Sequence, residues 1–224
     1  MKIHHYSHSS FNVYKSCPKK FEFSKLNPEI EMPTTKYMEF GSAFHEAVEN
    51  YHNKKVYNTK LIEAYTKEID ADFYDSVEKE ILIELKDVDS DDFIDTPFLA
   101  IIDGMNKDGL YDLKTTGTDL AQSKLNSSDQ ATLYCYMHFL QFAKIPIFHY
   151  IIYSRKNNTI KMKETYRSEK NFREFFKKMK VFDEKVKGNE FDRKLGRQCL
   201  YCPFAKQCVP NSLYEVLERT HGKL

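Results

Sequence analysis

Two aspartates and a lysine near the middle of the chain have the residue types and spacing for metal-assisted hydrolysis. The turn sequence Asn-Lys-Asp-Gly at 106–109 predicts a β-hairpin in which Asp103 lies opposite Asp112, and Lys114 points to the same face. Directly opposed carboxylates destabilise a sheet unless a cation or a proton lies between them. Mg²⁺ and Mn²⁺ prefer carboxylate oxygens, and a nearby ammonium group can orient a nucleophilic water or stabilise a phosphoryl transition state. The alternative is an exposed acidic hairpin without chemistry.

The cysteines form a second group with metal-ligand spacing. Cys199, Cys202 and Cys208 follow a C-x₂-C-x₅-C pattern, and three thiolates do not complete a tetrahedral site. Cys17 is the best fourth candidate, because Cys135 sits in an apolar helical stretch and is expected in the core. Four thiolates suit either Zn²⁺ or an iron-sulfur cluster, and the spacing alone does not decide between them.

The composition is that of a folded protein rather than a disordered one. Among 224 residues, 34 Lys and Arg face 33 Asp and Glu, a net charge of +1, and the chain has 17 Phe and 15 Tyr. No run approaches the roughly 20 apolar residues of a membrane helix, and the N-terminus lacks the apolar stretch of a signal peptide. We therefore expect a cytoplasmic protein, or one in the host cytoplasm if phage-encoded, with no membrane contact.

The near-zero net charge hides two oppositely charged regions. Residues 63–95 hold 13 acids and 3 bases, net −10, whereas residues 154–197 hold 15 bases and 7 acids, net +8. The basic region also contains the aromatic residues Tyr166, Phe172, Phe175, Phe176 and Phe182. Basic side chains interleaved with aromatics could contact phosphates and stack on bases, which predicts a nucleic-acid surface. An amphipathic helix with a solvated basic face is an equally good interpretation.

Hydrophobic periodicity predicts the elements that must position these residues. Helices are expected over about 11–21, 41–51, 60–75, 127–143 and 168–187, and strands over 81–85, 98–103, 110–114 and 147–154. This is an α/β or α+β pattern. We expect one domain over 1–224, with a mainly helical N-terminal part (1–80), a core with the basic helix (81–195) and a cysteine-rich C-terminal part (196–224).

Several segments resemble the PD-(D/E)XK nuclease superfamily, and its RecB-like branch in particular. Ile102-Asp103-Gly104 followed by Asp112-Leu113-Lys114 is similar to the metal-binding core of that superfamily. Further similar segments are Tyr6-Ser7-His8-Ser9-Ser10-Phe11, Cys17-Pro18-Lys19-Lys20-Phe21, Gly41-Ser42-Ala43-Phe44-His45-Glu46 and Gln130-Ala131-Thr132-Leu133-Tyr134. With the cysteines, the resemblance spans residues 6–208. One distant cysteine and a C-terminal trio look like the arrangement in the AddB nuclease domain and the CRISPR-associated RecB-like exonucleases.

The resemblance implies a restriction-endonuclease-like core, with a mixed central sheet flanked by helices, and a role for each matching residue. Asp103 and Asp112 would ligate Mg²⁺ or Mn²⁺, and His45 and the backbone carbonyl of Leu113 would complete the ligand set. Lys114 would position or activate the attacking water. One departure from the family pattern is Ala100, where a glycine is frequent. Asp rather than Glu at position 112 is within the pattern but shortens the ligand.

The resemblance also implies supporting residues and a second cofactor. Gln130 and Tyr134, one helical turn apart, would support the active site or contact DNA. A [4Fe-4S] cluster, with Zn²⁺ as the less favoured occupant, would join the two chain ends through four cysteines. Those cysteines are Cys17, Cys199, Cys202 and Cys208.

These observations together predict a Mg²⁺- or Mn²⁺-dependent deoxyribonuclease. The resemblance favours a single-strand exonuclease in recombination, repair, phage DNA processing or CRISPR adaptation. No P-loop motif is present, so any helicase must be a partner, and an integrase is another candidate partner. Two other interpretations stay open: a catalytically silent iron-sulfur DNA-binding scaffold that assembles with a helicase or integrase, and a zinc-stapled interaction domain.

Overall fold

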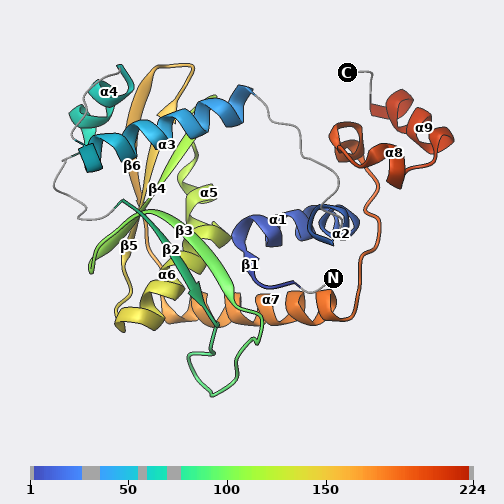
Figure 1. Cartoon of the computed structure of the whole chain (residues 1–224), viewed down its shortest axis with the longest axis horizontal. Coiled ribbons are helices and arrows are strands. Elements are labelled where there is room, and N and C mark those ends of the chain that lie inside the picture. The colour runs from blue at the N-terminus through green and yellow to red at the C-terminus, as the bar shows by residue number, and fades with distance from the viewer. Residues whose placement is uncertain (1–2, 27–35, 55–59, 70–76, 222–224) are drawn as a thin grey trace.

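The computed structural model describes residues 3–26, 36–54, 60–69 and 77–221, and a six-stranded mixed sheet lies at its centre (Figure 1). The strands are β1 (Tyr6–Ser7), β2 (Val77–Ile83), β3 (Phe98–Met105), β4 (Gly109–Thr116), β5 (Ile147–Ser154) and β6 (Thr159–Thr165). Their order is β1-β3-β4-β5-β6. Strand β2 stands outside this order and also pairs with β3. The β1–β3 and β4–β5 pairs are parallel and the others are antiparallel. The predicted mixed sheet is confirmed.

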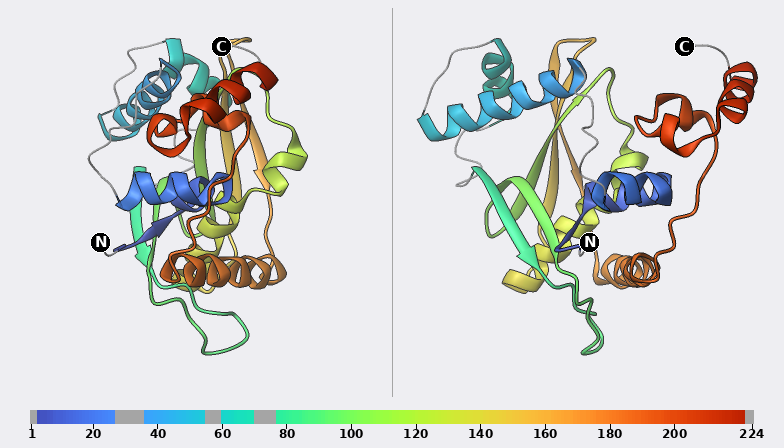
Figure 2. Two further views of the ribbon diagram at one scale, coloured as in Figure 1. Left: turned by 90° about the vertical axis from the view of Figure 1, so that its right-hand side faces the viewer. Right: turned by 45° about the vertical axis from the view of Figure 1, so that its right-hand side comes forward.

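Helices pack on both sides of this sheet, and a smaller helical lobe lies beside α2 (Figures 1 and 2). The helices are α1 (His8–Ser16), α2 (Pro18–Leu26), α3 (Lys36–Lys54), α4 (Lys60–Glu68), α5 (Gln122–Asn126), α6 (Asp129–Phe142), α7 (Glu169–Lys187), α8 (Ala205–Cys208) and α9 (Asn211–His221). A 3₁₀ turn, η1 (Arg197–Tyr201), precedes α8. Within the described ranges, no helix combines the length and the apolar character needed to cross a bilayer.

Two apolar clusters hold the layers together. The larger one joins one face of the sheet to α1, α6 and α7, and includes Phe11, Phe148 and Phe172. The smaller one joins the other face of β4–β6 to α3 and α4, and includes Phe44 and Tyr65. Burial of such side chains is the main favourable contribution to folding, so the clusters fix α3 and α6 on opposite sides of β4.

The N-terminal helical segment is broken into two helices at Cys17. The backbone of Cys17 is extended, with φ −162° and ψ 111°, and α2 starts at the next residue, Pro18. A proline disfavours the helical conformation in the residue before it and fits the first position of a helix. The break places Cys17 at a corner between α1 and α2.

Other element boundaries also differ from the sequence prediction. Helix α3 begins at Lys36 and not at Gly41. Strand β2 covers residues 77–83 instead of 81–85, because its pairing with β3 sets its limits. Strands β1 and β6 were not predicted, and residues 70–75 of the expected third helix lie outside the described residues.

The prediction that aromatics of the basic region stack on bases is wrong for those on α7. Phe172, Phe175, Phe176 and Phe182 are at most 3% exposed, because they form the apolar face that packs α7 against the sheet layer. Only Tyr166, which precedes the helix, is exposed among the five aromatics named above. The second interpretation, an amphipathic helix, describes α7.

Candidate active site

The hairpin between β3 and β4 has the predicted turn and register. Asn106 Oδ1 accepts hydrogen bonds from the backbone amides of Asp108 and Gly109, both at 2.8 Å, which closes the turn. Beyond the turn, Met105 pairs with Leu110 and Gly104 pairs with Tyr111. The predicted register therefore holds for the two residue pairs next to the turn, and Asp103 and Asp112 lie just beyond them.

The paired ladder of β3 and β4 ends at Gly104 and Tyr111, just before the two aspartates. The backbone amide of Leu113 donates to a side chain, Asp103 Oδ2 at 2.6 Å, and not to a backbone carbonyl of β3. The strands diverge from this point, and Figure 2 shows the two parts of the sheet fanning apart. Because the strands diverge, Ile102 lies in the larger apolar cluster and Leu113 in the smaller one.

Each aspartate holds one cationic group and one hydrogen-bond donor. Asp103 Oδ1 lies 3.0 Å from His45 Nδ1, and its other oxygen accepts from the Leu113 amide. Asp112 Oδ2 lies 2.7 Å from Lys114 Nζ, and its Oδ1 accepts from Gln130 Nε2 at 2.7 Å. The point where the strands diverge therefore gathers side chains from α3, β3, β4 and α6.

Burial dominates the electrostatics of Asp112, which is 3% exposed. Desolvation raises the pKa of Asp112 to about 6, the charge of Lys114 opposes that rise, and the charge of Asp103 adds to it. For His45, burial alone would lower the pKa, but the hydrogen bond and charge of Asp103, the charge of Asp112 and the Leu113 carbonyl together raise it. The site concentrates negative charge that is only partly compensated.

His45 reaches the acid pair from the opposite side of the sheet to Gln130. It belongs to α3, and its Nε2 donates to the backbone carbonyl of Leu113 at 3.1 Å. The Gly-x-x-x-His segment that suggested this residue thus puts His45 beside two of the predicted ligands, the Leu113 carbonyl and Asp103. The side chain of His45 is 39% exposed, so its ring is open to solvent on one side.

Helix α6 positions the two predicted supporting residues. Ser128 caps this helix by accepting from the amide of Ala131, and Gln130 lies in the first turn. Tyr134 follows one turn later and is buried, and desolvation together with the negative charge of Asp112 raises the pKa of its hydroxyl. Both side chains therefore face the acid pair. A buried guanidinium, Arg167, donates to the carbonyls of Leu125 and Ser128 and so secures the start of α6.

His8 is a residue of this region that sequence reasoning discounted as a solvated side chain. It is the first residue of α1 and is half-buried, and its ring accepts a hydrogen bond from Asn12 at 2.8 Å. Burial and the positive charge of Lys114 lower the pKa of His8 to about 4, with Asp129 opposing them. Its position inside the Tyr-Ser-His-Ser-Ser segment was the available signal. The neighbouring His4 and His5 are exposed, as expected.

The donors at the acid pair fit a hard divalent cation. Two carboxylates, an imidazole and a carbonyl oxygen converge there, and these are ligands that Mg²⁺ and Mn²⁺ accept. Asp112 Oδ2 is fully buried and has no well-oriented hydrogen bond, although Lys114 Nζ is close. In the described part of the chain, no three His, Cys, Asp or Glu side chains are already placed to hold a metal ion. A cation therefore requires His45 and Lys114, both partly exposed, to turn away from the carboxylates.

The four predicted cysteine ligands line one hollow of about 50 Å³. Cys17 comes from the corner between α1 and α2, and Cys199, Cys202 and Cys208 come from the C-terminal lobe. Burial raises the pKa of Cys202 and Cys208, and the neighbouring cysteines raise it further. Phe23 and Phe204 stack at the same hollow with ring centres 5.5 Å apart, which joins α2 to the lobe.

Cys135 lies apart from this hollow. It is fully buried in α6, and desolvation raises the pKa of its thiol to about 12. The expectation that it belongs to the core is confirmed. All five cysteines are free thiols in the structure.

Comparison with known families decides what kind of protein holds this arrangement. The family model described as PD-(D/E)XK nuclease superfamily matches residues 5–89 and 100–209. The chain belongs to this superfamily. The match includes both aspartates, Lys114, His45, Gln130 and all four cysteines at the hollow. The PD-(D/E)XK assignment makes the chain a nuclease, as its sequence predicted.

Solved structures agree with the PD-(D/E)XK fold. A protein from Eubacterium rectale that carries the name putative exonuclease has 14% identity and a TM-score of 0.62, and the match covers 95% of this chain and 92% of that one. The protein SSO0001 has 15% identity and a TM-score of 0.54, with 93% and 88% covered. At such identities the likeness establishes the fold alone. A search of curated protein sequences finds no match.

Proposed function

We propose that this PD-(D/E)XK protein is a metal-dependent nuclease that hydrolyses phosphodiester bonds of DNA. The observation that carries the proposal is the carboxylate pair, a buried Asp112 beside a partly buried Asp103, with Lys114 in contact with Asp112. An ionised carboxylate pair that is removed from water destabilises the folded protein unless a cation compensates its charge. A family member that keeps the pair, the lysine and the imidazole retains every group that hydrolysis needs.

The residues of the chain divide the work as follows. Asp103, Asp112 and the Leu113 carbonyl would hold Mg²⁺ or Mn²⁺, with His45 as a further ligand once its ring has turned from Asp103. The metal would supply polarisation of the scissile phosphate and a lower pKa for a bound water. Lys114 has an exposed fraction of 34% and sits at the solvent side of the pair, where its ammonium can orient the attacking water.

Gln130 supports this arrangement from α6. Its amide donates to Asp112 Oδ1 and leaves Oδ2 for the cation, so it sets the orientation of the carboxylate. Tyr134, buried behind it, limits the movement of the Gln130 side chain. We assign both residues a positioning role.

We further propose that the enzyme is an exonuclease that acts on single-stranded DNA ends. The support is the RecB-like character of the sequence segments together with the name of the Eubacterium rectale neighbour. Recombination, repair, phage DNA processing and CRISPR adaptation are the pathways in which such an activity fits. A helicase or an integrase is the partner that we expect, and the whole of residues 1–224 would act as one nuclease domain.

We propose a [4Fe-4S] cluster at the four cysteines. A tetrahedral Zn²⁺ with bonds of about 2.3 Å needs its four sulfurs within about 4 Å of one another. Within the described residues, no three cysteines are placed closely enough to hold a single ion, and a hollow lies between them. A cluster fills space between its ligands, so it fits this arrangement better than zinc does. It would tie α1–α2 to the C-terminal lobe.

The nuclease proposal is tested by digestion of end-labelled linear and of circular single-stranded DNA with anaerobically purified protein. The reactions contain Mg²⁺ or Mn²⁺, with a chelator control and a matched RNA substrate. Lys114→Ala should abolish cleavage, whereas Lys107→Ala, at the exposed turn of the same hairpin, should leave it unchanged. Loss of linear but not circular DNA would establish an exonuclease, and the position of the label gives its polarity.

Two other outcomes point to the rival functions. Cutting of circles indicates an endonuclease. A folded, brown protein that does not cleave any substrate is the catalytically silent iron-sulfur scaffold. A colourless protein with one equivalent of zinc and no cleavage is the zinc-stapled interaction domain.

A further inference from the structure

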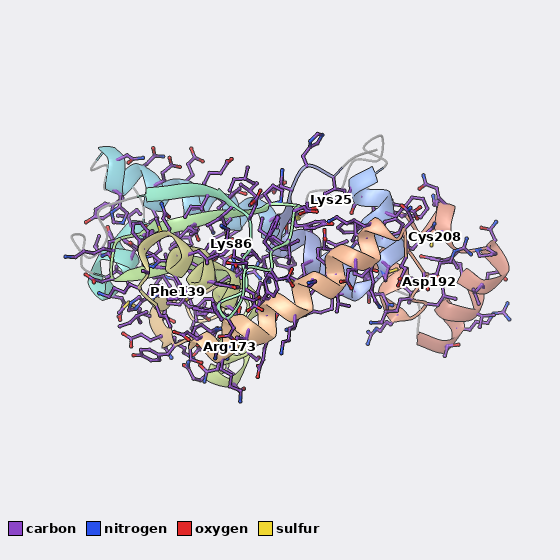
Figure 3. The ribbon with its side chains drawn as sticks, turned by 90° about the horizontal axis from the view of Figure 1, so that it is seen from below. Lys25, Lys86, Phe139, Arg173, Asp192 and Cys208 are labelled. Carbon is purple, nitrogen blue, oxygen red and sulfur yellow. The ribbon has the colours of Figure 1, made fainter. Side chains whose placement is uncertain are left out.

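The basic helix α7 is a poor surface for a polyanion, because neighbouring acids already hold most of its charges. An acidic loop between β2 and β3 lies along this helix, and Figure 3 shows Arg173 and Lys86 on this side of the molecule. Arg173 contacts Asp89 at 2.5 Å, Lys187 contacts Asp95 at 3.5 Å, and Lys180 pairs with Asp92. The oppositely charged regions found in the sequence therefore neutralise each other in part.

A second group of basic residues has no such compensation. Residues 193–210, which carry the three C-terminal cysteines, contain four bases and no acid. These bases are Arg193, Lys194, Arg197 and Lys206, and all four are exposed. Together with Lys15 on α1 and Lys20 on α2, we name these residues the basic track. Within the described ranges, Lys20, Arg193, Arg197 and Lys206 form no ion pair with a carboxylate.

Several contacts show that the basic track is one surface and not two. Lys194 Nζ donates to the carbonyl of Lys15 at 3.3 Å, which joins the C-terminal segment to α1. The Lys20 side chain lines the cysteine hollow, and its charge acts on Cys202. The charge of Arg193 acts on Cys208 of the same hollow. Figure 3 shows Cys208 and Asp192 close to α2, the helix that carries Lys25.

The basic track also reaches the active site. Lys15 Nζ lies 2.8 Å from Asp129 Oδ2, and Asp129 directly precedes Gln130, which holds Asp112. His8, on the same helix as Lys15, is subject to positive charge from both Lys15 and Lys114. Basic side chains therefore lie near both ends of α1, where Lys114 and Lys15 are each paired with an aspartate, and the bases of the basic track without an ion pair in the described residues lie on α2 and in the C-terminal lobe.

We propose that the basic track binds the phosphates of the DNA strand that flanks the scissile bond, and that α7 does not. The inference rests on the proposed function only in taking DNA as the ligand. The cysteine lobe has two roles in this proposal, because it closes the chain ends and presents Arg193, Arg197 and Lys206 to the strand. Phosphate contacts of this kind determine affinity and its salt dependence and carry no sequence preference.

The test compares two full-length variants with the same change in net charge. The track variant is Lys20→Gln, Arg193→Gln, Arg197→Gln and Lys206→Gln. The matched control, on α7, is Lys170→Gln, Lys177→Gln, Lys180→Gln and Lys185→Gln. Binding of a labelled single-stranded oligonucleotide is measured by fluorescence anisotropy with a chelator present, so that no cleavage occurs, at several salt concentrations. Visible absorption and thermal unfolding check that each variant keeps its cofactor and fold.

The proposal predicts a difference in the salt dependence. Each phosphate contact with a single strand contributes about 0.7 to the slope of log K against log salt, so four lost contacts lower the slope by about 3. The track variant should show that loss and bind at least ten-fold more weakly, whereas the control should keep the wild-type slope. An unchanged slope in the track variant, or an equal loss in the control, overturns the proposal. If the two variants differ in this way but the wild-type protein does not cleave DNA, the proposed nuclease activity is refuted while the proposed DNA-binding surface stands.

Discussion

Replacing Asp112 with asparagine should stabilise the metal-free protein while it abolishes nuclease activity. In the wild type, burial raises the pKa of Asp112 to about 6 from its ordinary value of 3.8. A shift of about two units at 1.36 kcal/mol each corresponds to roughly 3 kcal/mol that the ionised carboxylate costs the folded state at neutral pH. Asparagine carries no charge, and its Oδ1 can still accept from Gln130.

That value already includes the ion pair with Lys114, because the attraction of Lys114 opposes the rise of the Asp112 pKa. The Lys114 side chain is partly exposed, so water can solvate its ammonium when the partner is neutral. We expect the free energy of unfolding to rise by about 1–3 kcal/mol at pH 7.5. For a protein of this size that corresponds to an increase in Tm of a few to about 10 °C.

The dependence on pH identifies the cause. A carboxyl with a raised pKa binds its proton more tightly in the folded state, so wild-type stability falls as pH rises from about 4 to about 6. The advantage of Asp112→Asn should therefore vanish near pH 4 and reach its full size above pH 6. Denaturant unfolding in the presence of a chelator measures the stability of the wild type and of Asp112→Asn at each pH. Asp91→Asn, at an exposed aspartate, is the control. A variant that is less stable than wild type at pH 7.5, or a difference independent of pH, would refute this reasoning.

Three further substitutions test other parts of the structure. Gly104→Ala places a Cβ 1.8 Å from Tyr111 Cε1 and should lower the free energy of unfolding by about 1–3 kcal/mol, measured with denaturant. The control Gly117→Ala places a Cβ with no atom within 4 Å and should be tolerated sterically. Equal stabilities of the two variants would contradict the packing of Gly104 against Tyr111. Arg167→Lys loses the fork that donates to Thr132, Thr165 and three backbone carbonyls, so we expect a loss of about 2–4 kcal/mol, and a change under 1 kcal/mol would show that these bonds contribute little. Cys208→Ala should remove the visible absorption of the anaerobically purified protein, whereas Cys135→Ala should retain it, and the reverse result would reassign the ligands.

Short-range sequence patterns were sufficient for the central hairpin. The turn at 106–109 determines its register because the side chain of Asn106 closes the turn locally and the strand period is two. The helices over 128–143 and 168–187 were likewise predicted from periodicity and from their serine caps. Strand β6 escaped prediction because charged residues interrupt its few apolar ones, and its pairing with β5 makes it a strand.

Counting charged residues in windows of the sequence was not sufficient to locate a nucleic-acid surface. The basic region at 154–197 was a reasonable candidate for a nucleic-acid surface, yet α7 within it packs its aromatics inward and pairs three bases with the acidic loop. Those pairs join residues more than eighty positions apart, so no local window contains both partners. The uncompensated charges lie instead around the cysteines.

The sequence by itself determined the superfamily and predicted the acid pair and the cysteine ligands, because the segments that carry them are recognised by residue type and spacing. Only the tertiary structure decided that β3 and β4 diverge at the acid pair. It also decided that His45 approaches from α3 and Gln130 from α6, and that Cys17 meets the C-terminal trio. These arrangements depend on how two apolar clusters hold helices on opposite faces of one sheet, which is a property of packing and not of any single segment.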